Sequence, residues 1–379
     1  MSQPGQPLRV CLSTTSHPAR YSRFFDREAV SLARAGYDVR LVGLGDEDET
    51  RSESGVRLVI KARRPKPELI NAVARAAREE SCDIYQCLDP WTLRAGLALK
   101  RRRTEIRVVY ESSEWFPRMR LDRKDQSLAV RWLGWLAVTR LETRACRDAD
   151  AVIETNLTRA ERFKKQGCVP VLVPNYPPLD LLPEPAAERK PWFAWTGLVS
   201  RPRGFHKLLE ALVPVVQRFP DVRLRVIGEF DPRDDIETWS REFIRSQGIQ
   251  SNVEFLGSLA YRDMFDAIRP CLAGLILFQP ERGNDYTGQP NKLFEFMGSG
   301  LAVIASDFPE IGPVVRDADS GWLVEPKKPE SIAAAMVEAL SDPGLCRTKG
   351  TAGRRAVLAR YHWGIAEKAL LDLYAGLAG

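Results

Sequence analysis

Short apolar runs alternate with amphipathic stretches along almost the whole chain, and this alternation limits the folds open to it. The pattern predicts a strand over residues 8–13, a helix over residues 24–35 that stops at Gly36, and a second strand over residues 37–43. A strand, a helix and a strand in this order predict a parallel sheet. The charged residues 47–54 are expected to form an exposed loop.

A second alternating series begins near residue 192, after the clearest break in composition. Proline at high density stiffens a connection and cannot enter a central strand, so a domain boundary is expected here. The 379 residues are enough for two globular domains, each with its own core. The prolines that mark the break are Pro174, Pro177, Pro178, Pro183 and Pro185.

The stretch 281–306 carries the most specific local signal. Thr287 and Gly288 belong to a predicted loop, residues 291–297 to a helix, and residues 301–306 to a buried strand. Amide groups at the helix start, a close backbone approach at Gly288 and the charge of Lys292 suit a diphosphate. Glu295 lies one turn later and can accept hydrogen bonds from a ribose diol.

We therefore predict a nucleotide site in this stretch, with the Lys292 and Glu295 side chains aimed outward and the neighbouring apolar residues in the core. An exposed ion pair on an ordinary amphipathic helix is the alternative for these two residues.

Glycines close several strands of the second series, which predicts that ligand contacts recur at strand ends. Arg201 and Arg203 follow the first of these glycines closely enough to share a diphosphate with Lys292. The strand-end glycines are Gly197, Gly228, which Glu229 follows, and Gly257.

In the first half, three carboxylates follow predicted strands, where ligands of open α/β sheets bind. They are Asp89, Glu111 and Glu114, and a helix cap or surface ion pair is the alternative for each. A G-x-G-x-x-G motif is absent from the first turn, which argues against a nicotinamide or flavin site. His17, on the first loop, is a candidate contact for the acceptor or the donor phosphate, and a loop-capping role is its alternative.

Charge is unevenly distributed along the chain. Residues 1–180 carry 32 basic and 24 acidic side chains, although the whole chain has a formal charge of only +6. This surplus suits an acidic partner such as a membrane surface, although a solvated arginine-rich surface explains it equally well. Arginines beside Trp132 and Trp135 on the predicted helix 128–146 fit either a membrane interface or a core helix.

Neither a leader peptide nor a membrane-spanning run is recognisable, so a cytoplasmic protein is expected. The cysteines lack C-x-x-C spacing and are expected to be core thiols rather than disulfide partners or zinc ligands. They are Cys11, Cys82, Cys87, Cys146, Cys168, Cys271 and Cys346.

Most of the chain resembles the retaining nucleotide-sugar glycosyltransferases of family 4, which have the GT-B fold. The most specific segment is PNKLFEFMGSGLAVIAS (290–306), similar to the family's P-x-K-x-x-E helix and following strand. Supporting segments are TGLVSRPRG (196–204), VPNYP (173–177), RVIGE (225–229), YHW (361–363), FFDREAVSLARAGYDVRLV (24–42), LDPWTL (88–93) and VYESSEWFP (109–117).

The resemblance implies two Rossmann-like, doubly wound α/β domains that face each other across a cleft. Residues 1–175 would bind the acceptor, with the last helix, about 361–379, packing back on them, and residues 186–360 would bind the donor. Lys292 and Arg203 would hold the diphosphate and Glu295 the ribose, while the loop from Gly257 to Tyr261 would contact the base.

This sequence departs from the family pattern at three places. Thr287 replaces a glutamate associated with the donor sugar, Ser113 replaces a frequent histidine, and the glycine-rich first loop is replaced by residues 14–17. Recognition of the donor sugar and any step that needs that histidine are therefore not carried over.

The expected activity is retaining transfer of a sugar from a nucleotide diphosphate sugar, a UDP-sugar rather than a GDP-sugar, to a hydroxyl acceptor in polysaccharide or glycolipid biosynthesis. Asp89 or Glu114 would assist the acceptor proton. No cofactor or metal is expected, because cations and helix amides would stabilise the leaving diphosphate. The expected donor-binding residues are Gly197, Arg201, Arg203, Gly228, Glu229, Tyr261, Thr287, Gly288, Lys292 and Glu295.

A lipid-linked acceptor at the inner membrane face is favoured among the possible acceptors, and a nucleic-acid partner is not expected. Two alternatives stay open. One is a nucleotide-sugar epimerase or hydrolase of the same fold, and the other is a nucleotide-binding scaffold that has lost catalysis.

Overall fold

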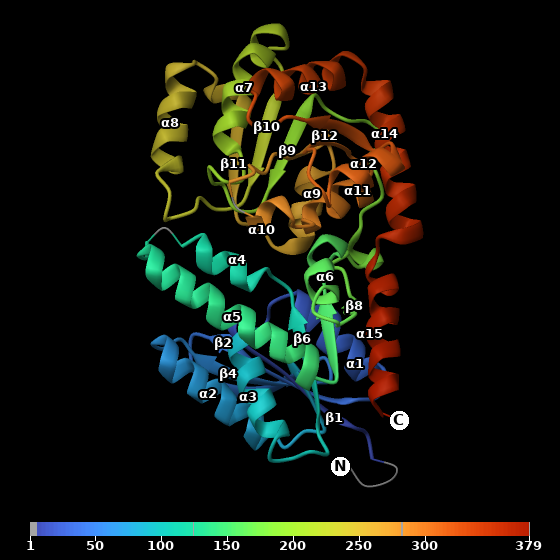
Figure 1. Ribbon diagram of the computed structural model, residues 1–379. Coiled ribbons are helices and arrows are strands. Elements are labelled where there is room, and N and C mark those ends of the chain that lie inside the picture. Colours follow the sequence, from blue (N-terminus) through green and yellow to red (C-terminus); the bar gives the residue numbers. More distant parts are fainter. Residues whose placement is uncertain (1–5, 124, 282, 379) are drawn as a thin grey trace. The chain divides into compact units, whose positions relative to one another are not determined.

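The computed structural model describes residues 6–123, 125–281 and 283–378 (Figure 1). The chain forms two compact units, one of Met1–Asn175 with Trp363–Gly379 and the other of Tyr176–His362. The division falls inside the proline-rich segment, and the last helix belongs to the first unit.

The first unit contains a sheet with the strand order β3-β4-β2-β1-β5-β6-β7-β8, in which only the edge strand β3 is antiparallel to its neighbour. Its strands are β1 (Arg9–Pro18), β2 (Asp38–Gly45), β3 (Glu49–Glu53), β4 (Val56–Ala62), β5 (Ile84–Cys87), β6 (Arg107–Ser112), β7 (Ala151–Glu154) and β8 (Val171–Leu172). Its helices are η1 (Arg23–Ala29), a π-helix, then α1 (Val30–Arg34), α2 (Lys66–Glu79), α3 (Pro90–Lys100), α4 (Phe116–Leu121), α5 (Leu128–Asp148), α6 (Leu157–Lys164) and α15 (Trp363–Ala378).

The second unit contains a wholly parallel sheet with the order β11-β10-β9-β12-β13-β14. Its strands are β9 (Trp192–Thr196), β10 (Arg223–Ile227), β11 (Val253–Gly257), β12 (Ala273–Ile276), β13 (Ala302–Ser306) and β14 (Gly321–Val324). Its helices are η2 (Leu179–Leu181), α7 (Phe205–Arg218), α8 (Ile236–Ser246), η3 (Gln250–Asn252), α9 (Tyr261–Ile268), α10 (Gly283–Tyr286), α11 (Asn291–Gly298), α12 (Gly312–Ala318), α13 (Pro329–Ser341) and α14 (Pro343–Arg360).

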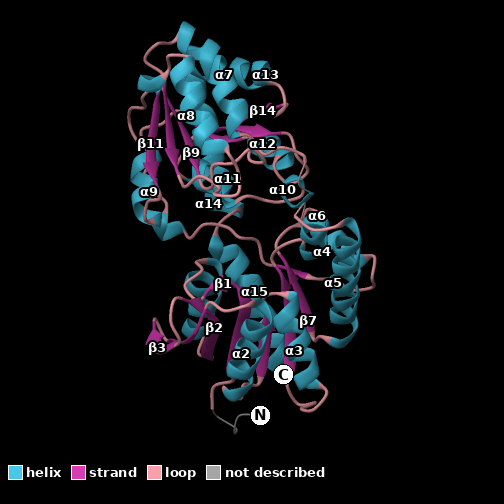
Figure 2. Cartoon of the chain, turned by 90° about the vertical axis from the view of Figure 1, so that its left-hand side faces the viewer, coloured by secondary structure: helices cyan, strands magenta, loops and turns pink. Residues whose placement is uncertain are grey.

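Both units are therefore Rossmann-like α/β sheets, as predicted, and helices lie beside the strands of each (Figure 2). In each sheet the strand order reverses beside the first strand of the unit. β1 lies between β2 and β5, and β9 lies between β10 and β12. These two reversal points are where ligands of doubly wound sheets bind.

Several local predictions were wrong. Residues 49–53 form the edge strand β3 instead of a loop, because a strand whose side chains are all charged or polar lacks the usual apolar alternation. β1 continues to Pro18, beyond the strand expected for residues 8–13. Glu111 lies inside β6 rather than after it. Helices α3, α4, α6, α10 and α12 were not predicted.

A buried polar contact attaches α15 to the sheet of the first unit. Tyr374 is fully buried, and its hydroxyl donates a hydrogen bond to the Gln86 side chain on β5. Tyr85 and Cys87 point to the opposite face of β5, where they pack with α2 and α3. The last helix thus completes one face of the first sheet.

Tyr374→Ala should lower the free energy of unfolding by about 3–5 kcal/mol, because it empties a fully buried aromatic site and leaves Gln86 without its donor. Chemical denaturation with hydrogen exchange at β5 measures this loss. Asp372→Ala, on the exposed side of α15, should change stability by less than about 0.5 kcal/mol. Equal stability of the two variants would show that α15 does not support the sheet.

Candidate functional site

The carboxyl ends of β9 and β12 form the strand reversal point of the second unit. Gly197 follows β9 with a φ of +84°, a backbone conformation that favours glycine. Gly228, after β10, lies so close that a Cβ added there would be 2.1 Å from the Gly197 carbonyl oxygen. Two neighbouring strands therefore end in backbone without side chains, which leaves room for a ligand to approach.

Two cationic side chains meet at Gly197. A Cβ added at Gly197 would be 3.8 Å from Lys292 Nζ and 3.8 Å from Arg203 Nη1. Lys292 comes from the first turn of α11, and Arg203 from the loop between β9 and α7. The structure thus brings together two of the residues predicted to hold a diphosphate.

Aromatic rings and a carbonyl hold this pair in place. Lys292 Nζ lies 4.9 Å from the centre of the Trp195 ring and donates a hydrogen bond to the Thr196 carbonyl. The Arg203 guanidinium lies 5.1 Å from the centre of the Phe278 ring. Neither cation forms a salt bridge with a carboxylate in the part of the chain that the structure describes. Two adjacent positive charges without a counterion make a site for an anion.

Burial, and then the nearby positive charge of Arg203, lower the pKa of Lys292 to about 7, while the charges of Glu295 and Asp285 act in the opposite direction. The side chain is only 6% exposed. Near neutral pH the empty site therefore holds lysine in both charge states, and a bound anion would favour the protonated one.

Lys292 and Glu295 are not aimed outward into solvent as the sequence predicted, since they are 6% and 7% exposed. The reason is that α11 packs against β12, β13 and α14 and is buried over most of its surface. Glu295 accepts a hydrogen bond of 2.8 Å from the Tyr261 hydroxyl at the start of α9. Lys292, Glu295 and Tyr261, which were all predicted to bind the donor, therefore lie close together.

The loop before α11 differs in detail from the prediction. The Gly288 N–H donates to the Asp285 carbonyl at 3.4 Å, and the Thr287 hydroxyl donates to the Gly283 carbonyl at 2.9 Å. The Gly288 N–H and the Thr287 hydroxyl thus bond to carbonyls of α10 instead of facing an empty binding site. The start of α11 itself has no side-chain cap; the Leu293 amide donates to the Pro290 carbonyl, and the Asn291 and Lys292 amides keep the capacity to bind an anion.

The structure does not place Arg201 with the Lys292–Arg203 pair. Its side chain forms salt bridges with Asp234 and Asp235, and it lies over the Trp239 ring. Its charge is already compensated, so it contributes less to an anion site than Arg203. Glu229 is exposed at the end of β10.

In the first unit, Asp89 lies at the other reversal point, after β5. One carboxylate oxygen accepts from the N–H groups of Trp91 and Thr92 and caps α3. The other accepts from Thr14 and from the backbone and hydroxyl of Thr15. Asp89 is fully buried, and these contacts fit the helix-capping alternative.

Glu114 is more accessible than Asp89. Its side chain is 35% exposed and lies 3.7 Å from the Arg159 guanidinium. His17 stacks on Tyr21 with ring centres 4.4 Å apart, and burial lowers the pKa of His17, while the charge of Glu114 acts in the opposite direction. The His17 imidazole therefore lies within electrostatic reach of the Glu114 carboxylate.

Glu111 belongs to a buried network that sequence reasoning missed. Arg23 Nε donates to Glu111 at 2.7 Å, and Arg23 also pairs with Glu28 at 3.0 Å. Gln86 donates to both carboxylates. Burial, and then the neighbouring charge of Glu111, raise the pKa of Glu28. Arg23 is a buried cation at the first position of η1, one residue before the helix that was predicted for residues 24–35.

In the part of the chain that the structure describes, no group of three or more His, Cys, Asp or Glu side chains could hold a metal ion. No described helix is both long enough and apolar enough to cross a membrane. All seven cysteines are free, and five are buried as expected, whereas Cys146 and Cys168 are partly exposed.

Comparisons with known proteins give the fold a family context. Residues 21–176 match the model of the glycosyl transferase 4-like domain, and residues 190–342 match the model of glycosyl transferases group 1. The first match lies in the first unit except for its last residue, and the second lies wholly in the second unit.

Curated relatives include phosphatidyl-myo-inositol mannosyltransferase of Mycobacterium tuberculosis, 31% identical over 189 residues that make up 48% of this chain and 46% of the relative. A second is the GDP-mannose-dependent monoacylated alpha-(1-6)-phosphatidylinositol monomannoside mannosyltransferase of Corynebacterium glutamicum, 28% identical over 46% of this chain and 44% of the relative. The matched part of the chain thus spans less than half the length of these relatives.

Among solved structures, sucrose-phosphate synthase of Thermosynechococcus elongatus aligns with a TM-score of 0.75 at 19% identity, over 98% of this chain and 99% of that one. HepE of Anabaena in complex with UDP-glucose aligns with a TM-score of 0.72 at 16% identity, over 97% and 100%. The chain therefore has the GT-B fold of the glycosyltransferases, and each of its two units matches a glycosyltransferase domain.

Proposed function

We propose that this chain transfers a sugar from a nucleotide diphosphate donor to a hydroxyl acceptor, with retention at the anomeric carbon. The observation that carries the proposal is the Lys292–Arg203 pair, two adjacent cations without a carboxylate partner among the described residues, at the strand reversal point of the second unit. A leaving diphosphate supplies the negative charge that this pair lacks.

The second unit also has groups suited to the rest of a nucleotide. Glu295 can accept hydrogen bonds from the two ribose hydroxyls, while the Tyr261 hydroxyl fixes its orientation. We assign the diphosphate to Lys292, Arg203 and the first-turn amides of α11. No metal ion is needed in this scheme, because these groups stabilise the charge that develops on the leaving group.

The sequence favours a UDP-sugar, but the relatives suggest a different first compound to test. They are mannosyltransferases, and one of them is named as GDP-mannose-dependent. We therefore propose GDP-mannose as the first donor to test, with UDP-sugars as the comparison. The names of these relatives also suggest a phosphatidylinositol-type glycolipid as the first acceptor.

The first unit is proposed to bind the acceptor. Asp89 holds the cap of α3 and the segment at Thr14 and Thr15, so we assign it a positioning role. Glu114 is the carboxylate with more exposed surface, and it is our candidate to accept the acceptor's proton. Neither residue is proposed to form a covalent intermediate.

Lys292→Ala should reduce transfer about 100- to 1,000-fold, which corresponds to roughly 2.7–4 kcal/mol of transition-state stabilisation. Arg203→Ala should also reduce transfer strongly, because it removes the other cation at Gly197. Arg201→Ala is the matched control, since Asp234 and Asp235 already compensate its charge, and it should cost less than about tenfold.

Initial rates with labelled donor and acceptor measure these effects, and an acceptor-free reaction separates transfer from hydrolysis. Wild-type activity in Lys292→Ala would contradict the assignment of the site. Donor turnover that never needs an acceptor would instead indicate a hydrolase or epimerase, and nucleotide binding without turnover would indicate a scaffold.

The buried lysine also predicts a pH dependence of stability. The pKa of Lys292 is about 7 in the folded chain and about 10.4 when unfolded, so between these values the unfolded state binds more protons. The stability of the wild type relative to Lys292→Met should therefore rise with pH from 7 to 9, by up to about 1.4 kcal/mol per pH unit.

Denaturant titrations at several pH values, without nucleotide, measure this slope. Lys368→Met, on the exposed surface of α15, should follow the wild type at every pH. Parallel curves for the wild type and Lys292→Met would show that the ammonium group of Lys292 is not desolvated.

We further propose that α5 contacts a membrane surface, where a lipid acceptor would lie. Its first half exposes large apolar side chains, with Leu128 at 64%, Trp132 at 53% and Leu133 at 67%. The buried residues of α5 lie in its second half, so a core position does not account for these three side chains. Exposed apolar side chains with basic neighbours are suited to an anionic lipid interface. The nearby arginines are Arg118, Arg120, Arg123 and Arg131.

Trp132→Ser with Leu133→Ser should weaken binding to vesicles that contain phosphatidylglycerol by at least about tenfold, because two large apolar contacts are lost. Ile365→Ser, which is 48% exposed on α15, is the control and should bind like the wild type. Flotation at low and high salt measures the binding. Salt-insensitive binding, or none in the wild type, would contradict membrane contact through α5.

A further inference from the structure

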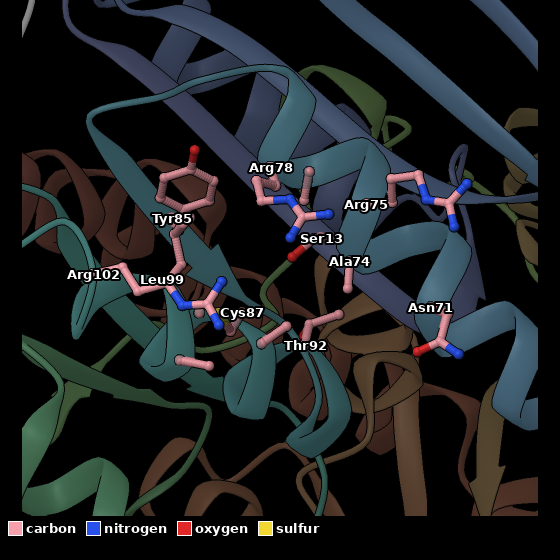
Figure 3. A pocket seen from close by; sticks show the side chains of 14 residues that line it. Ser13, Asn71, Ala74, Arg75, Arg78, Tyr85, Cys87, Thr92, Leu99 and Arg102 are labelled. Atoms are coloured by element: carbon pink, nitrogen blue, oxygen red, sulfur yellow. The ribbon is translucent and has the colours of Figure 1, made fainter.

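A pocket of about 440 Å³ lies between α2 and α3 in the first unit, over strands β1 and β5 (Figure 3). This volume lies within the usual range for small-molecule sites. None of its 14 lining residues is a predicted donor-binding or catalytic residue. The glycosyltransfer proposal therefore leaves this pocket without a role.

Small side chains on the two facing helices make the hollow. Ala74 and Ala77 of α2 face Ala95 and Ala98 of α3 across the pocket, and Tyr85 and Cys87 lie on β5 beneath it. Methyl groups in place of longer side chains leave the space between the helices unfilled. Much of the lining is therefore apolar and suited to a hydrocarbon group.

Arginines stand at the margin of this apolar lining. Arg78 comes from the last turn of α2, and Arg102 follows the end of α3. Figure 3 shows both guanidinium groups over the strands, whereas Arg75 lies farther along α2. In the part of the chain that the structure describes, none of these three side chains forms a salt bridge or hydrogen bond.

We propose that this pocket binds a small anionic amphiphile, with its charged group between Arg78 and Arg102 and a single hydrocarbon chain along the alanines of α2 and α3. Charge complementarity selects an anion, because two guanidinium groups stand at the margin of one pocket and neither forms a salt bridge in the described part of the chain. The apolar lining selects a ligand that also has an apolar part. The occupant is a single-chain molecule, since the hollow lies between only two helices.

The pocket is also adjacent to the reversal point of the first sheet. Thr92 lines it and donates to the carboxylate and carbonyl of Asp89, and Ser13 of β1 lies on the same wall. An occupant would therefore touch the residues that fix the Asp89 cap. The proposal concerns binding and does not depend on sugar transfer.

Calorimetry on the full chain, with decyl phosphate below its micelle concentration, tests the proposal. One molecule should bind per chain. Decyl glucoside, which lacks the charge, and inorganic phosphate, which lacks the chain, should each bind at least about tenfold more weakly. Equally tight binding of decyl glucoside would overturn the role of the arginines, and equally tight binding of phosphate would overturn that of the apolar lining.

Arg78→Gln with Arg102→Gln should weaken decyl phosphate binding at least about tenfold. Arg94→Gln is the matched control, because Arg94 is exposed on α3 but does not line the pocket, and its effect should be smaller than about twofold. Unchanged binding in the double variant would overturn the proposal, as would no binding in the wild type.

Two further variants separate this pocket from the exposed apolar surface of α5. Ala95→Leu should fill the hollow and abolish binding, whereas Trp132→Ser with Leu133→Ser should leave it unchanged. Binding that persists in Ala95→Leu but is lost in Trp132→Ser with Leu133→Ser would place the amphiphile on α5 and overturn the proposal. Circular dichroism and thermal unfolding check that each variant is folded. If Ala95→Leu does not fold, the double variant Arg78→Gln with Arg102→Gln tests whether the amphiphile binds in this pocket.

Discussion

The repulsion between two adjacent cations, Lys292 and Arg203, is the constraint on which the second unit's chemistry depends. Both approach Gly197, and neither has a carboxylate partner in the described chain. Burial and this repulsion keep the pKa of Lys292 near 7. Both side chains lie at the strand reversal beside β9, where Gly197 and Gly228 bring the ends of two neighbouring strands close together. Under the proposed function, a bound diphosphate would relieve this repulsion. The pair of cations would then lower the stability of the empty fold and raise its affinity for the diphosphate.

The two units use their reversal points differently. At β9 the surroundings leave positive charge uncompensated, whereas at β1 the carboxylate of Asp89 is saturated by the α3 cap and by Thr14 and Thr15. The second unit therefore has uncompensated positive charge at its reversal point, whereas the carboxylate at the first unit's reversal point is already paired. Deeper in the first unit, Gln86 connects Glu28 and Glu111 with Tyr374, so the last helix shares a buried polar network with the central strands.

The sequence predicted much of this arrangement. Both sheets, most strands of the second unit and the helix that carries Lys292 follow from alternation and from glycine and proline positions. Three kinds of feature could not be predicted. The edge strand β3 has no apolar periodicity. The burial of Lys292 and Glu295 depends on Trp195, Phe278 and Tyr261, which other elements of the second unit supply. The pairing of Arg201 with Asp234 and Asp235 is a tertiary choice between two similar arginines, and local sequence does not distinguish Arg201 from Arg203.

Proton uptake on nucleotide binding tests the central claim most directly. Calorimetric titration of GDP, and of UDP as the comparison, at pH 8 in two buffers with different ionisation enthalpies gives the number of protons taken up. Because the pKa of free Lys292 is about 7 and a bound diphosphate would raise it, the account predicts uptake approaching one proton in the wild type and none in Lys292→Met. Binding of equal affinity in both proteins, without proton uptake in either, would contradict the account.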